Sequence, residues 1–192
     1  MPRATGRRLV RYAGMELGCS LDFAAVERVL ELAASEAGRG TVGLPGGGRV
    51  VRSFDRLRFM TAGGPMRREP VAVSVPGNYE WAGSRVCLDV SAAEPVPGGC
   101  VRLKLSGAEA SSAPLVLRGW RAGDHYQPAG HFRDQKLKEM FQEARIPSWR
   151  RDSWPILCQG TEILWARQFG AAADRAAGAS GRTLCVWEEK LS

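Results

Sequence analysis

Two hydrophobic periods divide this 192-residue chain. In the first part, Asp22 precedes apolar residues that recur at helical spacing on one face until Gly38. Because an aspartate side chain can accept the first free backbone N–H groups of a helix, we expect Asp22 to be an N-cap. The basic segment before it is compatible with a further helix. The apolar face comprises Phe23, Val26, Leu30, Ala33 and Ala37, and the basic segment carries Arg3, Arg7, Arg8 and Arg11.

From Val71 onward, the predicted strands show the period of two that is typical of half-buried strands. Residues 41–60 predict short strands around a glycine-rich turn at Gly46–Gly48. Segments 76–84 and 91–99 are rich in turn residues, so we expect loops there. Residues 154–166 predict a hairpin that turns at Gln159–Gly160. Further strands are predicted over 71–75, 85–90, 101–105, 115–120 and 183–187.

One helix interrupts the strands of the last third. Asp134 is its expected N-cap, and Pro147 ends it because proline cannot continue a helix. Its apolar face consists of Leu137, Met140, Phe141 and Ala144. Short antiparallel strands with a few helices indicate an α+β fold in two to three small modules. With boundaries in loops at 61–70 and 106–114, these are a helical linker region with a β-hairpin (1–62), a small β module (63–112) and a C-terminal domain (113–192).

Composition favours a globular protein with an anionic partner. Apolar residues make up 44% and charged residues 24% of the chain, which is ordinary for a soluble protein. A net charge of +7 and a pI near 9.6 favour RNA, DNA or an anionic membrane, with a generic basic surface as the alternative. No apolar run approaches the about 18 residues of a membrane span. The N-terminus also lacks a signal peptide's apolar core, so we expect a cytoplasmic location and no membrane partner.

The cysteines indicate neither a zinc site nor a disulfide framework. They are odd in number, widely spaced and contain no CxxC pair. We therefore expect no metal and separate, reduced, buried thiols. The five positions are Cys19, Cys87, Cys100, Cys158 and Cys185.

Motifs for catalysis are weak. Gly38–Gly43 matches G-x-G-x-x-G, but it follows a predicted helix instead of opening one, the reverse of a dinucleotide site, and no G-x-x-x-x-G-K-[ST] loop occurs. Asp124, His125 and His131 could serve a general base mechanism, with Asp124 as the orienting group. An aspartate directly after Gly123 is better explained by a turn in which it accepts backbone N–H bonds. We therefore assign no catalytic residue and no cofactor, and keep an independent His/Asp hydrolase as an alternative.

A cluster of basic and aromatic residues between 118 and 157 carries more information. Guanidinium groups fit phosphate oxygens bidentately, ammonium groups add point charge, and an aromatic ring such as Trp149 can stack on a base. Trp154 and Trp165 lie in strand patterns and are expected in the core. Interspersed acidic residues leave a salt-bridged surface as the alternative. The candidates for RNA binding are Arg118, Arg121, Lys136, Lys138, Arg145, Trp149, Arg150 and Arg151.

A second basic group lies upstream. Two separated cationic zones suit an extended partner such as a folded RNA better than a small molecule. This group consists of Arg49, Arg52, Arg56, Arg58, Arg67 and Arg68.

Residues 117–166 resemble the C-terminal domain of bacterial tRNA(Ile)-lysidine synthetases. That family shows an Arg before a Gly-Asp-Arg-Phe-x-Pro turn, a Lys-Lys-Leu-x-x-x-Phe helix, a Pro and an Arg, and an apolar hairpin ending in Ile-x-Trp. The matching positions here are Arg118, Gly123–Pro128, Lys136–Leu137 with Phe141, Pro147 with Arg151, and Ile163–Trp165. Upstream, residues 21–33 and 44–59 resemble the family's region between catalytic and C-terminal domains.

The resemblance implies a tRNA(Ile)-binding role for the chain. His125 takes the place of the family's Arg and joins the candidate RNA-binding residues, while Gly123, Asp124, Pro128 and Pro147 would set the turns that aim them. The family's Ser-Gly-Gly-x-Asp-Ser loop, which binds ATP phosphates, does not occur here, and Arg167–Phe169 replaces a Gly-rich step. In the family, a separate catalytic domain adenylates the wobble cytidine, and lysine then displaces AMP.

We therefore expect ATP and lysine to be used by a catalytic domain absent from this chain, which would be inactive alone. The C-terminal module would hold the acceptor stem of the tRNA. The alternative is a protein-interaction module that docks onto its own missing or a separately encoded ATP-binding domain.

Overall fold

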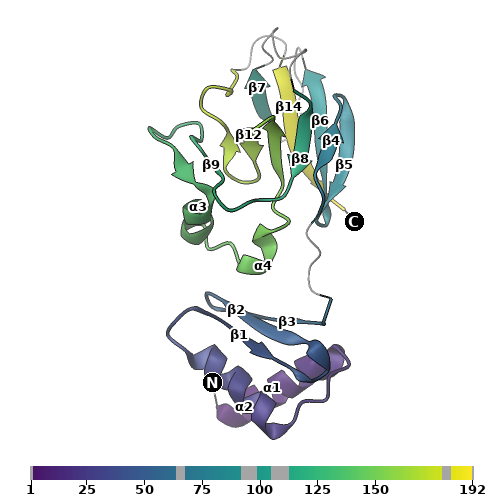
Figure 1. Cartoon of the computed structure of the whole chain (residues 1–192), viewed down its shortest axis with the longest axis vertical. Coiled ribbons are helices and arrows are strands. Elements are labelled where there is room, and N and C mark those ends of the chain that lie inside the picture. The colour runs from purple at the N-terminus through teal and green to yellow at the C-terminus, as the bar shows by residue number, and fades with distance from the viewer. Residues whose placement is uncertain (1, 64–67, 92–98, 105–112, 179–182, 192) are drawn as a thin grey trace. The chain divides into compact units, whose positions relative to one another are not determined.

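The computed structural model describes residues 2–63, 68–91, 99–104, 113–178 and 183–191. The chain forms two compact units, Met1–Met66 with Pro147–Trp149 and Arg67–Ile146 with Arg150–Ser192 (Figure 1). These are named unit 1 and unit 2.

Unit 1 combines two helices with a three-stranded antiparallel sheet. Its elements are α1 (Arg3–Glu16), α2 (Phe23–Ala34), β1 (Arg39–Gly43), the 3-10 turn η1 (Pro45–Gly47), β2 (Arg49–Ser53) and β3 (Arg56–Met60). The strand order is β1-β2-β3. Val10 of α1, Val26 and Val29 of α2, and Val50 of β2 share one apolar core. Helix α2 therefore packs against both α1 and the sheet.

Both predicted helices of unit 1 are confirmed, and Asp22 caps the second. Its Oδ1 accepts a hydrogen bond from the backbone N–H of Ala25 at 2.7 Å. The predicted apolar face is partly wrong, because Phe23 is 57% exposed and the helix ends before Ala37. The buried side of α2 is instead centred on Ala25, Val26 and Val29, which face α1 and the sheet.

Arg52, a member of the upstream basic group, has a structural role in unit 1. Its Nη1 donates to the carbonyl oxygen of Leu32 at 2.7 Å and to that of Ser35, and its Nε donates to that of Phe54 at 3.0 Å. The last carbonyls of a helix have no partner within the helix. Arg52 thus completes the C-terminal end of α2. The other described members in this unit, Arg49, Arg56 and Arg58, are exposed, and Arg67 lies outside the described residues.

Unit 2 contains two larger antiparallel sheets and a two-stranded ribbon. Its elements, with α4 divided between the two units, are β4 (Val71–Val73), β5 (Gly77–Trp81), β6 (Ser84–Ser91), β7 (Val101–Lys104), β8 (Leu115–Arg118), β9 (His125–Tyr126), β10 (Gln135–Lys136), α3 (Leu137–Glu143), α4 (Ser148–Arg151), β11 (Ile156–Gln159), β12 (Glu162–Ala166), β13 (Gly170–Ala171) and β14 (Thr183–Lys190). The sheet orders are β13-β12-β11-β8-β4 and β5-β6-β14-β7, and the ribbon is β10-β9.

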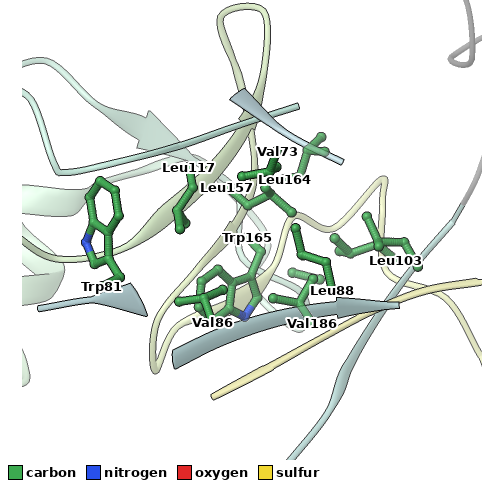
Figure 2. Packing of buried hydrophobic residues seen from close by; sticks show 12 residues of the cluster. Val73, Trp81, Val86, Leu88, Leu103, Leu117, Leu157, Leu164, Trp165 and Val186 are labelled. Atoms are coloured by element: carbon green, nitrogen blue, oxygen red, sulfur yellow. The ribbon is translucent and has the colours of Figure 1, made fainter. Parts of the chain in front are cut away.

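The two larger sheets face each other across a common core (Figure 2). Leu117, Leu157 and Trp165 of the five-stranded sheet pack with Val86 and Val186 of the four-stranded sheet. Each of these side chains is at most 4% exposed. Because burial of such a side chain contributes about 1.5–3 kcal/mol, this sandwich stabilises unit 2.

A β-bulge lets the five-stranded sheet fill this core. Leu157 pairs with Trp165 and Cys158 with Ile163, so Leu164 is an extra residue in β12. As a result, Leu164 and Trp165 both reach the sandwich core, while Ile163 lies in the core on the opposite face.

The opposite face of the five-stranded sheet is covered by α3. Phe141 of this helix is fully buried, and its ring centroid lies 5.7 Å from that of Trp120, 5.6 Å from Trp154 and 5.7 Å from Phe169. Tilted and edge-on aromatic contacts of this kind add to the hydrophobic gain. The expected core positions of Trp154 and Trp165 are confirmed, at 5% and 4% exposed.

The α+β class with short antiparallel strands is confirmed, as are the hairpin of β11 and β12 and the final strand β14. The loop predicted at 76–84 is wrong, because residues Gly77–Trp81 form β5 and pair with β6. Tyr79 and Trp81 alternate with polar residues there, and Trp81 is only 2% exposed. The turn residues at both ends hid this short alternation.

The predicted cap of α3 is also wrong. Gln135–Lys136 pair with β9, so the chain enters α3 from an extended strand and Lys136 takes the N-cap position without a side-chain bond. Asp134 lies before this strand. The helix ends at Glu143, ahead of Pro147. Within the described ranges, no helix has the length and apolarity needed to cross a membrane.

The predicted inter-module loops at 61–70 and 106–114 are only partly described, since 64–67 and 105–112 lie outside the described residues. So do residues 92–98 of the loop predicted at 91–99. Strand β4 from the predicted module 63–112 pairs with β8 from 113–192, with Val71 opposite Leu117. The division of the chain at 62 and 112 stays a prediction.

The cysteines are free thiols, and Cys87, Cys158 and Cys185 are buried as predicted. Cys19 and Cys100 are half-buried. Burial raises the pKa of the Cys158 thiol to about 11, although Arg118 acts in the opposite direction.

We expect Phe141→Ala to lower the free energy of unfolding by about 3–5 kcal/mol, because it leaves a cavity at the centre of the aromatic cluster. Phe132→Ala is the matched control. Its side chain is 102% exposed, so the same chemical change should cost less than about 0.5 kcal/mol. Urea unfolding followed by tryptophan fluorescence measures both, and equal losses would contradict the described core.

We expect the stability to fall as the pH rises from about 8.5 towards 11. The unfolded Cys158 thiol loses its proton near its ordinary pKa of about 8.5, whereas the buried thiol keeps it until a pKa of about 11. In this pH range, deprotonation of Cys158 in the unfolded state therefore lowers the free energy of unfolding by up to about 1.4 kcal/mol per pH unit. Urea unfolding at about pH 8, 9 and 10 should show a shallower decline in Cys158→Ala than in the wild type. Identical slopes would be inconsistent with a buried protonated thiol.

Candidate nucleic-acid interface

Asp124 organises the turn that follows β8. Its Oδ2 accepts a hydrogen bond from Arg118 Nη1 at 2.7 Å, and its Oδ1 accepts one from Arg118 Nη2 at 2.9 Å. Oδ2 also accepts the backbone N–H of Arg121 at 2.7 Å, and the N–H of Asp124 donates to the Arg121 carbonyl at 3.1 Å. Gly123 has a φ of 95°, which glycine adopts without strain. One carboxylate thus closes the turn and holds a guanidinium bidentately.

Asp124 also connects the turn after β8 to helix α3. The carbonyl oxygen of Asp124 accepts the backbone N–H of Leu137, the first residue of the helix, at 3.0 Å. Between these two points runs the β9–β10 ribbon, with His125 opposite Lys136. The ribbon is tied to the large sheet by a bridge between Pro128 and Ala172. The end of β8, the ribbon and the start of α3 are therefore one hydrogen-bonded framework.

A pocket of about 300 Å³ opens beside this framework. Three arginines from two distant segments line it, and Glu69 is the acidic residue in its lining. At Gly119, an added Cβ would lie 2.1 Å from the carbonyl oxygen of Asp152, so the close approach of these two backbones requires glycine. The lining residues are Arg68, Glu69, Pro70, Arg118, Gly119 and Arg121.

Arg68 reaches the pocket from the segment before β4. Its guanidinium carbon lies 5.8 Å from the Trp81 ring centroid, and its Nη1 donates to the carbonyl oxygen of Glu80 at 3.1 Å. A guanidinium that lies near an aromatic face gains an attraction of about 0.5–1 kcal/mol at an exposed site. Arg68 is thus held at the pocket while remaining exposed.

Arg118 and Arg121 contribute differently to the pocket. Arg118 is 8% exposed, and burial alone would lower its pKa, but the hydrogen bonds and charge of Asp124 raise its pKa above the ordinary value. It is a permanent cation whose two Nη atoms already bind Asp124, and Nη1 also donates to Gly119 at 3.0 Å. Arg121 is exposed, so its guanidinium is accessible to a ligand.

Outside the pocket, the predicted RNA-binding cations lie on the ribbon, α3 and α4. Within the described part of the chain, no ion pair involves Lys136, Lys138 or Arg150. Their charges are therefore not neutralised by direct contacts. The exposed members of the predicted set are His125, Lys136, Lys138, Arg145 and Arg150.

Arg145 and Arg151 lie beyond the C-terminal end of α3. Arg145 has a φ of 50°, a left-handed conformation that glycine usually supplies after a helix. Arg151 is half-buried: its Nε donates to the Ile146 carbonyl at 3.0 Å, and its guanidinium carbon lies 5.6 Å from the Phe141 ring centroid. Burial lowers its pKa. Arg151 thus supports the packing around Phe141. Trp149 is a half-buried residue of α4.

The two histidines do not form a unit with Asp124. Nδ1 of His125 lies 2.8 Å from the Gly123 carbonyl oxygen, and Nδ1 of His131 lies 2.8 Å from Gln135 Nε2. The Asp124 carboxylate instead binds Arg118 and the backbone of Arg121. Of the residues described, no three or more His, Cys, Asp or Glu side chains are placed to hold a metal ion. The geometry gives no support to a hydrolase.

Two residues gain a place that the sequence pattern did not assign. Arg68 belongs to the upstream basic group by sequence, yet it lines the pocket of unit 2. Phe132 lies in the loop between β9 and β10 (residues 127–134), here named the ribbon loop. Its side chain is 102% exposed, and it was not among the predicted site residues. The signal that could have found it is a large apolar residue between His131 and Arg133 in a turn-rich loop.

We expect Asp124→Asn to lower the free energy of unfolding by about 2–4 kcal/mol, because it removes the countercharge of the buried Arg118. The two side chains are 10% and 12% exposed. Glu162→Gln is the matched control, since this carboxylate also lies 2.7 Å from an arginine, Arg175, but is 64% exposed. It should change stability by less than about 1 kcal/mol. Similar small losses in both variants, measured by chemical denaturation, would contradict the central role of Asp124.

Comparison with known proteins places this geometry in a family. Residues 115–187 match the family model described as the TilS substrate C-terminal domain. A tRNA(Ile)-lysidine synthase of Solibacter usitatus is 40% identical over 187 residues, covering 91% of this chain and 42% of that protein. One of Symbiobacterium thermophilum is 31% identical over 189 residues, covering 91% and 38%. The chain thus spans about two fifths of the length of these relatives.

A solved structure agrees with these matches. The crystal structure of a TILS C-terminal domain aligns with a TM-score of 0.55 at 25% identity, covering 65% of this chain and 98% of that one. Over most of its length, the chain is therefore homologous to the C-terminal region of tRNA(Ile)-lysidine synthases, and residues 115–187 belong to the family of TilS substrate C-terminal domains.

Proposed function

We propose that this chain is a tRNA-docking part of a tRNA(Ile)-lysidine synthase, in which unit 2 grips the phosphate backbone of the tRNA. The observation that carries the proposal is the pocket in which Arg68, Arg118 and Arg121 converge. Even when Asp124, which pairs with Arg118, is counted together with Glu69, the three guanidinium groups leave an excess of positive charge. An RNA phosphate is the anion that such a site suits best, because guanidinium forks match its oxygen geometry.

The three arginines of the pocket would have different roles in binding a phosphate. Arg118 forms a fixed part of the pocket wall, since the Asp124 carboxylate binds both of its Nη atoms and compensates its charge. Arg121 and Arg68 are exposed and can turn their donors towards a phosphate. Because hydrogen bonds within the chain hold the Asp124 framework, little conformational entropy would be lost at this point on binding.

The exposed cations of the ribbon and α3 would extend the contact along the backbone. Lys136 and Lys138 are exposed, and Asp124 links the start of α3 to the turn beside the pocket. Contacts with phosphates position a nucleic acid without reading its sequence. We therefore assign docking, and not base recognition, to this group of cations.

The chemistry of lysidine formation would belong to the remaining length of the relatives. There, ATP and lysine would be used, and tRNA(Ile) would be the shared substrate of both parts. This chain would contribute no catalytic residue of its own. Its partners would be tRNA(Ile) and the ATP-binding domain, on the same or another chain.

A second candidate function, docking onto that ATP-binding domain, is favoured by one observation in unit 1. Leu9, Tyr12 and Met15 recur every third residue along α1 and are 54%, 63% and 70% exposed. An exposed apolar stripe on a helix suits a protein surface. Binding to a separately produced ATP-binding domain that persists in high salt and is lost in Tyr12→Asp would support it.

We expect the double variant Lys136→Glu/Lys138→Glu to bind a tRNA(Ile) transcript about 10- to 100-fold more weakly at roughly 100 mM salt. Each lost phosphate contact should also reduce the slope of log affinity against log salt by about 0.9. A fluorescence anisotropy titration at several salt concentrations measures both quantities.

The matched control is Lys104→Glu/Lys190→Glu, which makes the same charge change at two exposed lysines of the four-stranded sheet. It should weaken binding only slightly. Equal losses of affinity in the two double variants would mean that only the net charge of the chain matters. Unchanged affinity of Lys136→Glu/Lys138→Glu would show that the ribbon and α3 are not part of the interface.

A further inference from the structure

We propose that Phe132 is a stacking platform for an unpaired base of the bound RNA, so that the ribbon loop selects RNA with a single-stranded segment beside a duplex. The inference rests on the proposed function, because it assigns a contact within the same interface. It starts from one observation: the Phe132 side chain is 102% exposed, at the end of the β9–β10 ribbon.

The loop that carries Phe132 is held in place. The backbone N–H of His131 donates to the Pro128 carbonyl at 3.0 Å, and Nε2 of Gln127 donates to the His131 carbonyl at 2.6 Å. At the base of the loop, the N–H of Ala129 donates to the carbonyl oxygen of Ala171 in β13 at 2.8 Å. The aromatic ring is thus presented from an ordered support instead of a frayed end. Figure 1 shows β9 to the left of the larger sheets, above α3.

The surroundings of Phe132 suit a nucleic acid. His131 and Arg133 flank it and are exposed, and Lys136 and His125 pair across the ribbon behind it. Asp134 is the acidic residue of this loop. A ring at the end of a mostly cationic ribbon lies where a base would be offered by a backbone that the cations hold.

A protein partner fits these surroundings less well. Protein interfaces rely on clusters of apolar and aromatic side chains at their centre. Among the described residues of unit 2, the other large hydrophobic side chains that are exposed are Val71 and Leu191, on β4 and after β14. Strand β4 is the edge opposite β13, to which the loop is tied, and β14 belongs to the other sheet. A single ring is insufficient for an apolar interface, but it is sufficient to stack on one base.

The base must be unpaired, because paired bases expose only their edges and not their faces. Stacking on an aromatic ring tolerates any base, since every base has a π-face. The loop would therefore read the presence of a single-stranded nucleotide and not its identity. This differs from the pocket and the lysines, which would contact phosphates irrespective of pairing.

The test compares two RNA hairpins with the same stem, one blunt and one with a four-nucleotide single-stranded 3′ end. We expect Phe132→Ala in the full chain to weaken binding to the tailed hairpin by roughly 5- to 100-fold and to leave binding to the blunt hairpin unchanged. Phe132→Tyr should bind like the wild type, whereas Phe132→Leu should behave like Phe132→Ala. Phe23→Ala, which removes an exposed ring from unit 1, is the matched control and should bind both hairpins normally.

Equal affinity of the wild type and Phe132→Ala for both hairpins would overturn the inference and leave the ring to a protein partner. A uniform loss on both hairpins would overturn it as well, because stacking on an unpaired base cannot affect the blunt RNA. Failure of the wild type itself to bind either hairpin or tRNA would instead reject the proposed function.

Discussion

The bidentate pair of Arg118 with Asp124 is the interaction on which the candidate interface depends. Through its carboxylate, Asp124 holds the buried guanidinium and the backbone of Arg121, and through its carbonyl it receives the first N–H of α3. A buried arginine without this partner would be an uncompensated charge, which costs several kcal/mol. The same residue connects the pocket, the ribbon with Lys136 and the start of α3 with Lys138.

The layered core explains why this framework is rigid. The five-stranded sheet is buried on both faces, against the four-stranded sheet on one and α3 on the other. Residues of β11 and β12 contribute to both cores, and the bulge at Leu164 adds one further side chain to the sandwich core. The turn that contains Asp124 follows the end of β8. The position of the turn therefore depends on the two buried residues Leu117 of β8 and Phe141 of α3. Function and stability thus share one set of contacts, which makes the surface cations the safer targets for mutation.

The hydrophobic pattern predicted the α+β class, the hairpin of β11 and β12 and the apolar face of α3, because these depend on residues close in sequence. It missed β5, since the tight turns around a five-residue strand resemble a loop, and it misplaced the cap of α3, since pairing of Gln135–Lys136 with β9 is not a local property. The candidate site was harder to predict from the sequence than the fold. The basic cluster was visible in the sequence, but Arg68 reaches the pocket only because strands far apart in sequence share a sheet. Burial of Arg118 and exposure of Phe132 follow from tertiary packing alone.

The central claim is that the basic surface recognises folded tRNA. The most direct measurement is a titration of the chain against a tRNA(Ile) transcript and an unstructured RNA of equal length, each at two salt concentrations. The account predicts tighter binding to the tRNA with a steep loss of affinity at higher salt, because several phosphates are held in a fixed arrangement. Equal, weak binding to both RNAs would contradict it and would leave the basic surface without a specific partner.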